Sequence, residues 1–166
     1  MSEEVKADEA NAPRGRVPPA KQIYPQRLHH AVPSWVASGR IFHIRIRCLP
    51  ENSVPLIKPE VAEQLRLSVA FYEAKMRWHC RLFLLMPDHV HALLGFPEQE
   101  PMSRVVGDWK RYQHKQLGIL WQDNYFDHRL RNSDELVTKT SYIRQNPVVK
   151  GLCSTAEEWP WVWSFE

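Results

Sequence analysis

The stretch at 86–94, Met-Pro-Asp-His-Val-His-Ala-Leu-Leu, places two histidines one residue apart in a segment that predicts a β-strand. Side chains alternate between the faces of a strand, so His89 and His91 are expected to project side by side from one face. The apolar residues beside them then point to the opposite face, into a core. Two neighbouring imidazoles on rigid backbone form half of a divalent-metal site, although two polar surface histidines of a sheet give the same pattern.

The composition is that of a soluble globular protein, with 43% apolar and 25% charged residues, and 166 residues suit one domain with a real core. The net charge of +3 is compatible with a polyanion partner. Three cysteines without a C-x-x-C pair argue against a disulfide framework or a zinc ribbon and favour a reducing cytoplasm. We expect neither a signal peptide nor a membrane span.

The segment 1–27 predicts a disordered tail, because it is rich in Glu, Ala and Pro and poor in large apolar residues. A single domain is expected at 28–166. Its first strand, at 41–48, alternates strictly, with Phe42, Ile44, Ile46 and Cys48 on one face. The other face carries His43, Arg45 and Arg47, which would either approach a phosphate backbone or form a solvated surface.

Hydrophobic periodicity predicts the remaining elements of one fold. We expect Met76 to belong to the core-facing stripe of the first helix and Ser103 to cap the second. The expected order is strand 41–48, helix 59–76, strands 78–85 and 89–96, helix 103–117, a short strand or loop at 121–131 and a last helix from 132 towards 147. This order is the α+β pattern of ferredoxin-like and RNA-recognition folds, an antiparallel sheet with two helices on one face and the other face free for a site.

Basic and aromatic side chains gather in two segments of the second half. Helix 103–117 carries a basic stripe, and the segment 121–131 is dense in aromatic residues and arginines. This composition suits contact with single-stranded nucleic acid, and it equally suits an aromatic plug on the core. Together with the arginines of the first strand, the candidate DNA-binding residues are Arg45, Arg47, Lys110, Arg111, Lys115, Trp121, Tyr125, Phe126, Arg129 and Arg131.

The last helix carries two polar residues at a spacing of four. Asn132 is expected to cap it, with Glu135 three residues later in capping-box register. Tyr142 and Asn146 share one face, so both reach the histidine pair if this helix lies over the open face of the sheet. Asn146 then offers an oxygen ligand for Mg²⁺ or Mn²⁺, and Tyr142 offers a phenol as a nucleophile.

Three segments resemble a known family. The stretch M-P-D-H-V-H-A-L-L is similar to the histidine–apolar–histidine (HUH) motif of single-strand DNA transposases. The segments W-Q-D-N-Y-F-D-H-R-L-R and Y-I-R-Q-N-P-V-V-K-G-L resemble the REP-associated tyrosine transposases, a bacterial branch of that superfamily. The resemblance covers roughly residues 28–165, and its strength lies in the joint occurrence of these motifs.

The resemblance implies that His89, His91 and Asn146 hold a divalent metal, Mg²⁺ or Mn²⁺, and that Tyr142 forms a 5′-phosphotyrosine link with DNA. It also implies the same fold, with the helix of the tyrosine over the open face of the sheet. The implied partner is single-stranded DNA beside hairpin-forming repeats, at the nucleoid in the cytoplasm. Whether the protein is a monomer or a homodimer stays open.

Three roles for the whole chain remain distinct at this point. The first is the DNA transesterase, the second is a binder of hairpin DNA or RNA without catalysis, and the third is a replication or plasmid-transfer enzyme. The third usually carries further domains, for which 166 residues leave no room. Asp88 could orient a histidine or cap a turn.

Overall fold

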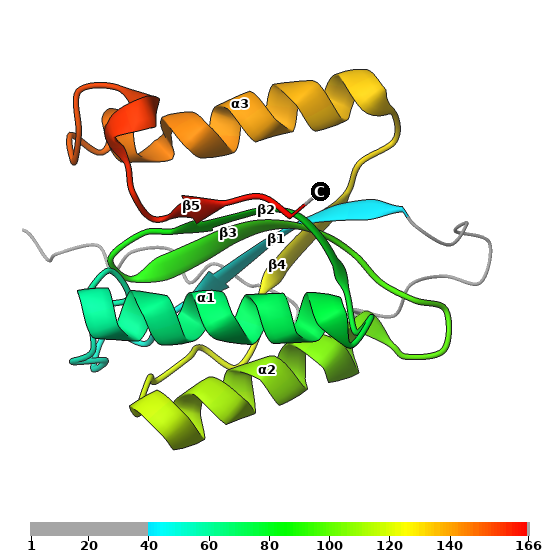
Figure 1. Cartoon of the computed structure of the whole chain (residues 1–166), viewed down its shortest axis with the longest axis horizontal. Coiled ribbons are helices and arrows are strands. Elements are labelled where there is room, and N and C mark those ends of the chain that lie inside the picture. Colours follow the sequence, from blue (N-terminus) through cyan, green and yellow to red (C-terminus); the bar gives the residue numbers. More distant parts are fainter. Residues whose placement is uncertain (1–39, 166) are drawn as a thin grey trace, which may run out of the picture.

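The computed structural model describes residues 40–165, which form three layers. A central sheet lies between helices α1 (Pro59–Ala74) and α2 (Met102–Leu117) on one side and helix α3 (Ser133–Val149) on the other (Figure 1). The predicted α+β architecture is therefore confirmed. The predicted tail at 1–27 and the predicted start of the domain at 28 lie outside the described residues. None of the helices within residues 40–165 combines the length and apolar composition needed to cross a membrane.

The sheet is antiparallel and has the strand order β4-β1-β3-β2-β5. Its first four members in this order are those of a ferredoxin-like sheet. In such a sheet the two strands that precede the helices are central, and the two strands that follow the helices lie on either side of them. Alternation of side chains along β1 and β3 gives the sheet two different faces. The strands are β1 (Ile41–Arg47), β2 (His79–Leu85), β3 (His89–Gly95), β4 (Phe126–Arg129) and β5 (Val162–Trp163).

The main hydrophobic core lies between the sheet and the helices α1 (Pro59–Ala74) and α2 (Met102–Leu117). The apolar face predicted for the first strand points into it, and Ile44 is completely buried. Trp109 of α2 is also completely buried, and its indole N–H donates to the hydroxyl of Ser68 on α1 at 3.0 Å. This core leaves the opposite face of the same strands available for polar residues.

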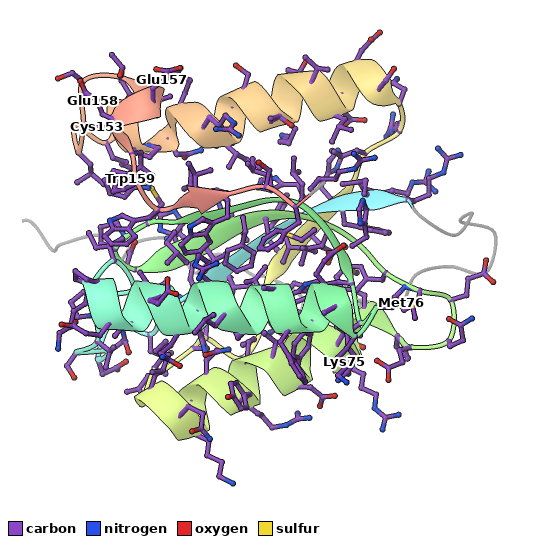
Figure 2. The ribbon with its side chains drawn as sticks, in the orientation of Figure 1. Lys75, Met76, Cys153, Glu157, Glu158 and Trp159 are labelled. Atoms are coloured by element: carbon purple, nitrogen blue, oxygen red, sulfur yellow. The ribbon has the colours of Figure 1, made fainter. Side chains whose placement is uncertain are left out.

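Two helix ends differ from the prediction. Helix α1 ends at Ala74, and Met76 has a φ of 53° and is 81% exposed, so it does not join the core stripe. Lys75 and Met76 follow the end of α1 (Figure 2). Helix α2 begins at Met102 after the N-cap Pro101, whose carbonyl accepts the N–H of residues 104 and 105, so Ser103 lies inside the first turn. The helix therefore begins one residue earlier than predicted, and its N-cap lies two residues earlier, at a proline whose φ is fixed near the helical value.

A smaller core attaches α3 (Ser133–Val149) to the other face of the sheet. Ile143 is completely buried there against apolar side chains of β2 and β3. Trp159 belongs to the same cluster, and its indole N–H donates to the carbonyl of Leu85 at 2.9 Å. Figure 2 places Trp159 beneath the loop that leaves α3, after the short helix η1 (Ala156–Glu158). These apolar contacts hold α3 over the sheet.

The N-terminus of α3 is fixed by the residue predicted to cap it. The side-chain oxygen of Asn132 accepts the backbone N–H of Glu135 at 2.9 Å. The carboxylate of Glu135 bonds the N–H of Arg131 and the imidazole of His128, so it does not close the reciprocal capping box on Asn132.

We expect Asn132→Ala to lower the free energy of unfolding by about 1 kcal/mol, because the N–H of Glu135 loses its acceptor. Urea denaturation followed by tryptophan fluorescence measures this change. Ser133→Ala, one residue further along the exposed start of the helix, is the matched control and should leave the unfolding midpoint unchanged. Equal midpoints for both variants would show that the cap does not stabilise α3.

Candidate active site

The two histidines of β3 lie on the sheet face beneath α3, as their spacing predicts. Their ring centroids are 5.0 Å apart, and the rings are close to perpendicular. In the register of the sheet, Arg45 of β1 is opposite His91 and Arg47 is opposite His89. Both imidazoles are largely buried, His91 at 2% and His89 at 8% exposure. A strand that is paired on both sides holds them in fixed positions.

Each histidine uses its Nδ1 atom for a contact with a neighbour. His89 Nδ1 lies 2.6 Å from a carboxylate oxygen of Asp88, so this carboxylate takes the orienting contact that was one of its two predicted roles. His91 Nδ1 lies 3.0 Å from Nε2 of His43, a residue of β1. On each of these two imidazoles, Nε2 is therefore the nitrogen that remains for binding a metal ion.

Burial keeps these imidazoles neutral. It lowers the pKa of His91 to about 2, and the neighbouring His89 and His43 act in the same direction. The pKa of His43 falls to about 4 for the same reason, with further lowering by Lys139 and Arg45. Burial also lowers the pKa of His89, although the hydrogen bond and charge of Asp88 oppose the shift. Neutral imidazole is the form that donates a lone pair to a metal ion.

Helix α3 brings Tyr142 and Asn146 to this face of the sheet. The Tyr142 ring centroid is 6.5 Å from the rings of both His43 and His91. The tyrosine side chain is 53% exposed, so its phenol is accessible to a substrate, while the neighbouring Ile143 anchors the helix. Lys139, one turn earlier on α3, places its ammonium 5.0 Å from the tyrosine ring centroid.

The amide of Asn146 is oriented by the backbone of its own helix. Its Nδ2 donates to the carbonyls of Tyr142, at 2.9 Å, and Ile143, at 3.3 Å. Pro147 lies within α3 and has no N–H, so the carbonyl of Ile143 lacks its usual helical partner. The asparagine N–H takes that place. The amide oxygen is then the atom of Asn146 that is free to bind a metal ion.

Tyr142, Asn146, His89 and His91 line one cavity of about 440 Å³. Among residues 40–165, no three His, Cys, Asp or Glu side chains gather as a metal site. The candidate set is instead two neutral imidazoles and one amide oxygen. This mixed nitrogen and oxygen set fits a divalent ion that keeps further positions for water or phosphate oxygens.

Three of the predicted DNA-binding residues lie at this cavity or on its rim. Arg45 and Arg47 of β1 line the cavity. Phe126 begins β4 directly opposite Arg45, is 43% exposed, and has the Arg45 guanidinium 5.3 Å from its ring centroid. The strand alternation that placed the arginines on the polar face of β1 therefore predicted their location.

The other predicted DNA-binding residues lie elsewhere. Trp121 and Tyr125 are buried in the main core, the alternative that the sequence had left open for the aromatic segment. Lys110 is buried too, and its ammonium donates to the carbonyls of residues 122 and 123. Arg111 and Lys115 are exposed on α2, and Arg131 is exposed in the loop before α3. Arg129 is half-buried at the end of β4. Helix α2 covers the opposite face of the sheet, so its charges are separated from the cavity (Figure 1).

Sequence reasoning did not single out two residues near the tyrosine. His43 was grouped with the arginines of β1, and the contact with His91 depends on a strand pairing between residues 48 positions apart. Lys139 precedes Tyr142 by three positions, a helical spacing that places both on one face. That spacing could have predicted that Lys139 lies beside Tyr142 on the helix.

Comparisons with known proteins identify the family of this chain. The family described as "Transposase IS200 like" matches residues 40–146. A protein of Haemophilus influenzae named "Putative REP-associated tyrosine transposase" is 25% identical over 95 residues, which cover 46% of this chain and 53% of that protein. The REP-associated tyrosine transposase of Escherichia coli is 25% identical over 101 residues, 59% of this chain and 61% of that protein. The chain thus spans between half and two thirds of the length of these relatives.

The fold has a counterpart among solved structures. A REP-associated tyrosine transposase bound to a REP hairpin superimposes with a TM-score of 0.66 at 19% identity, over 79% of this chain and 80% of that one. At this identity the match concerns the fold. The family match includes both histidines of β3 and extends through Tyr142 to Asn146. The chain belongs to the IS200-like transposase family.

Proposed function

We propose that this protein is a metal-dependent transesterase of single-stranded DNA, which cleaves and rejoins DNA beside hairpin-forming repeats. The observation that carries the proposal is the meeting of four side chains around one cavity. Tyr142 and Asn146 come from α3, and His89 and His91 come from β3. A protein that only binds nucleic acid has no need for an exposed phenol beside a pair of neutral, oriented imidazoles.

The proposed reaction exchanges one phosphate ester for another. The phenol oxygen of Tyr142 attacks the phosphorus of the scissile phosphate, and the bond between phosphorus and the 3′ oxygen breaks. The phenol proton is lost as the new bond forms, and the leaving 3′ oxygen takes up a proton to become a hydroxyl. The product is a 5′-phosphotyrosine, which a 3′ hydroxyl can attack to reverse the step. No nucleotide cofactor is required, because the link conserves the phosphate ester.

His89, His91 and Asn146 are the proposed ligands of a divalent ion, Mg²⁺ or Mn²⁺. When bound, such an ion polarises the oxygens of the scissile phosphate and stabilises the charge that develops there. Asp88 supports His89 through its Nδ1 atom, and the helix backbone holds the Asn146 amide. The chain itself therefore supplies ligands whose orientation is set before the substrate arrives.

The proposed substrate follows from the rim of the cavity and from the relatives. Arg45 and Arg47 offer positive charge to a phosphate backbone, and the exposed ring of Phe126 offers a face to an unpaired base. The structurally similar transposase is bound to a REP hairpin. We infer that a single strand next to a hairpin stem lies across β1 and β4, with its scissile phosphate beneath α3.

Affinity for such DNA should fall with salt, because phosphate contacts release counterions. We expect Arg47→Gln to reduce the slope of log affinity against log salt by about 0.7, the value for one single-strand phosphate contact. Fluorescence anisotropy with a labelled hairpin carrying a single-stranded flank measures the slope. Arg66→Gln is the control, since Arg66 lies on α1 and is bonded to Glu63. An unchanged slope for Arg47→Gln, or equal affinity for blunt duplex, would contradict the proposed surface.

One assay tests the function as a whole. The full chain is incubated with labelled hairpin DNA and Mn²⁺, and denaturing gels are examined for a covalent protein–DNA adduct. An adduct that disappears on addition of a chelator supports the transesterase. Tight binding of the hairpin without an adduct, at any of several flanking sequences, would instead support a binding protein without catalysis.

A further inference from the structure

His43 is the only imidazole of β1, and it lies beneath α3 beside the two histidines of β3. It is 4% exposed, and its ring plane lies 16° from parallel with that of His91, with the ring centroids 5.3 Å apart. The Nε2 atom of His43 and the Nδ1 atom of His91 are 3.0 Å apart, within hydrogen-bond distance. Neither the exchange of phosphate esters nor the three proposed ligands uses His43.

The hydrogen bond between these two rings has a direction that matters for metal binding. A neutral imidazole carries one proton, and a metal ion takes the lone pair of the nitrogen without it. If His43 donates from Nε2 to Nδ1 of His91, the proton of His91 lies on its own Nε2 and blocks an ion. If His91 donates from Nδ1 to His43, its Nε2 is free for the ion.

We propose that His43 is a positioning residue that accepts the Nδ1 proton of His91 and so keeps His91 Nε2 available to the divalent ion. This inference rests on the proposed function, since it assigns the support of one proposed ligand. It gives the two histidine ligands different partners. His89 is supported by the carboxylate of Asp88, and His91 is supported by a neutral ring on the neighbouring strand.

The surroundings of His43 hold its ring in place without fixing the direction of its bond to His91. Its other nitrogen, Nδ1, has no hydrogen-bond partner among the described protein groups, so neither tautomer of His43 is fixed from that side. The ring is held in place by its hydrogen bond with His91 and by the edge contact with Phe126, whose centroid is 5.6 Å away. The strand pairing of β1 with β3 fixes the distance between the two imidazoles.

The proton positions are directly measurable. We expect long-range ¹⁵N–¹H correlation spectra of the full chain, saturated with diamagnetic Mg²⁺, to show both His43 and His91 protonated on Nδ1. Single His→Gln variants assign the signals. A proton on Nε2 of His43 would overturn the proposal, because His43 would then be a donor.

Metal affinity supplies the second measurement. His43→Phe keeps a ring of similar size and removes the acceptor, so the affinity for Mn²⁺, followed by electron paramagnetic resonance, should fall about 10- to 100-fold. His43→Gln retains an acceptor and should keep most of the affinity. His128→Gln is the control, because His128 is opposite His43 on the same face but contacts Glu135. Wild-type affinity in His43→Phe would overturn the proposal.

These measurements separate the inference from the proposed function. If wild-type protein forms no adduct while His43→Phe loses Mn²⁺ affinity, the transesterase is wrong and the positioning role stands. If the adduct forms and His43→Phe binds Mn²⁺ as wild type does, the positioning role is wrong and the transesterase stands. Should His43→Phe fail to fold, the spectrum of the wild-type protein alone decides.

Discussion

Tyr142→Phe should form no covalent adduct with hairpin DNA, and cleavage should fall by at least about 10⁴-fold, as for the loss of a catalytic nucleophile. The substitution removes one oxygen from a side chain that is 53% exposed. Its ring, and the contact of that ring with the Lys139 ammonium, are retained. We therefore expect the free energy of unfolding to stay within about 0.5 kcal/mol of wild type and hairpin affinity to be nearly unchanged.

The matched control for this variant is Tyr112→Phe. Tyr112 is 51% exposed, close to the value of Tyr142, but belongs to α2 on the opposite side of the sheet. The Tyr112→Phe variant should cleave hairpin DNA and form the covalent adduct as wild type does. Mass spectrometry of the wild-type adduct then identifies the modified residue. A nucleotide attached to any tyrosine other than Tyr142, or an adduct formed by Tyr142→Phe, would show that the nucleophile is assigned wrongly.

His89→Ala should abolish the response of the protein to Mn²⁺. For wild type, an ion at 100 times its dissociation constant stabilises the folded state by about 2.7 kcal/mol, which raises the melting temperature by several degrees. The variant lacks one of three proposed ligands, so this rise should disappear. Cleavage should fall by about 10³-fold or more, since stabilisation of the phosphate charge contributes several kcal/mol. Differential scanning fluorimetry with and without Mn²⁺ measures the first effect.

His79→Ala is the control for the metal experiment. His79 lies on β2, its side chain is 49% exposed, and it contacts Glu73 of α1. This variant should keep the Mn²⁺-dependent rise in melting temperature and its cleavage activity. Wild type in chelating buffer should resemble His89→Ala. Full cleavage by His89→Ala in that buffer would rule out the proposed metal site.

Regular alternation made the sheet predictable from the sequence. The apolar residues of β1 and the pair His89 and His91 obey a period of two, and each took the expected face. The cap of α3 at Asn132 was predicted for a local reason, because its partner is three residues away. These features are set by residues close together in the sequence, so a sequence pattern is enough to predict them.

Other features depend on pairing between distant segments, which a single sequence does not specify. The contact of His43 with His91 needs the register of β1 against β3. Trp121 and Tyr125 have the composition of a stacking surface, but the bridge of Trp121 to Cys48 carries this segment into the main core beside Trp109. Lys110 is buried beside this segment, because its ammonium donates hydrogen bonds to the carbonyls of residues 122 and 123.

The two-faced sheet has a consequence for how such a chain can change over evolutionary time. Along β1 and β3, residues that form the main core alternate with residues that line the cavity, so each strand is under selection for stability and for chemistry at once. Single substitutions alter one of these properties. The insertion or deletion of one residue inside β3 would exchange the two faces, placing histidines in the core and apolar side chains in the cavity. Length variation among relatives is therefore expected in the loops between elements rather than in these two strands.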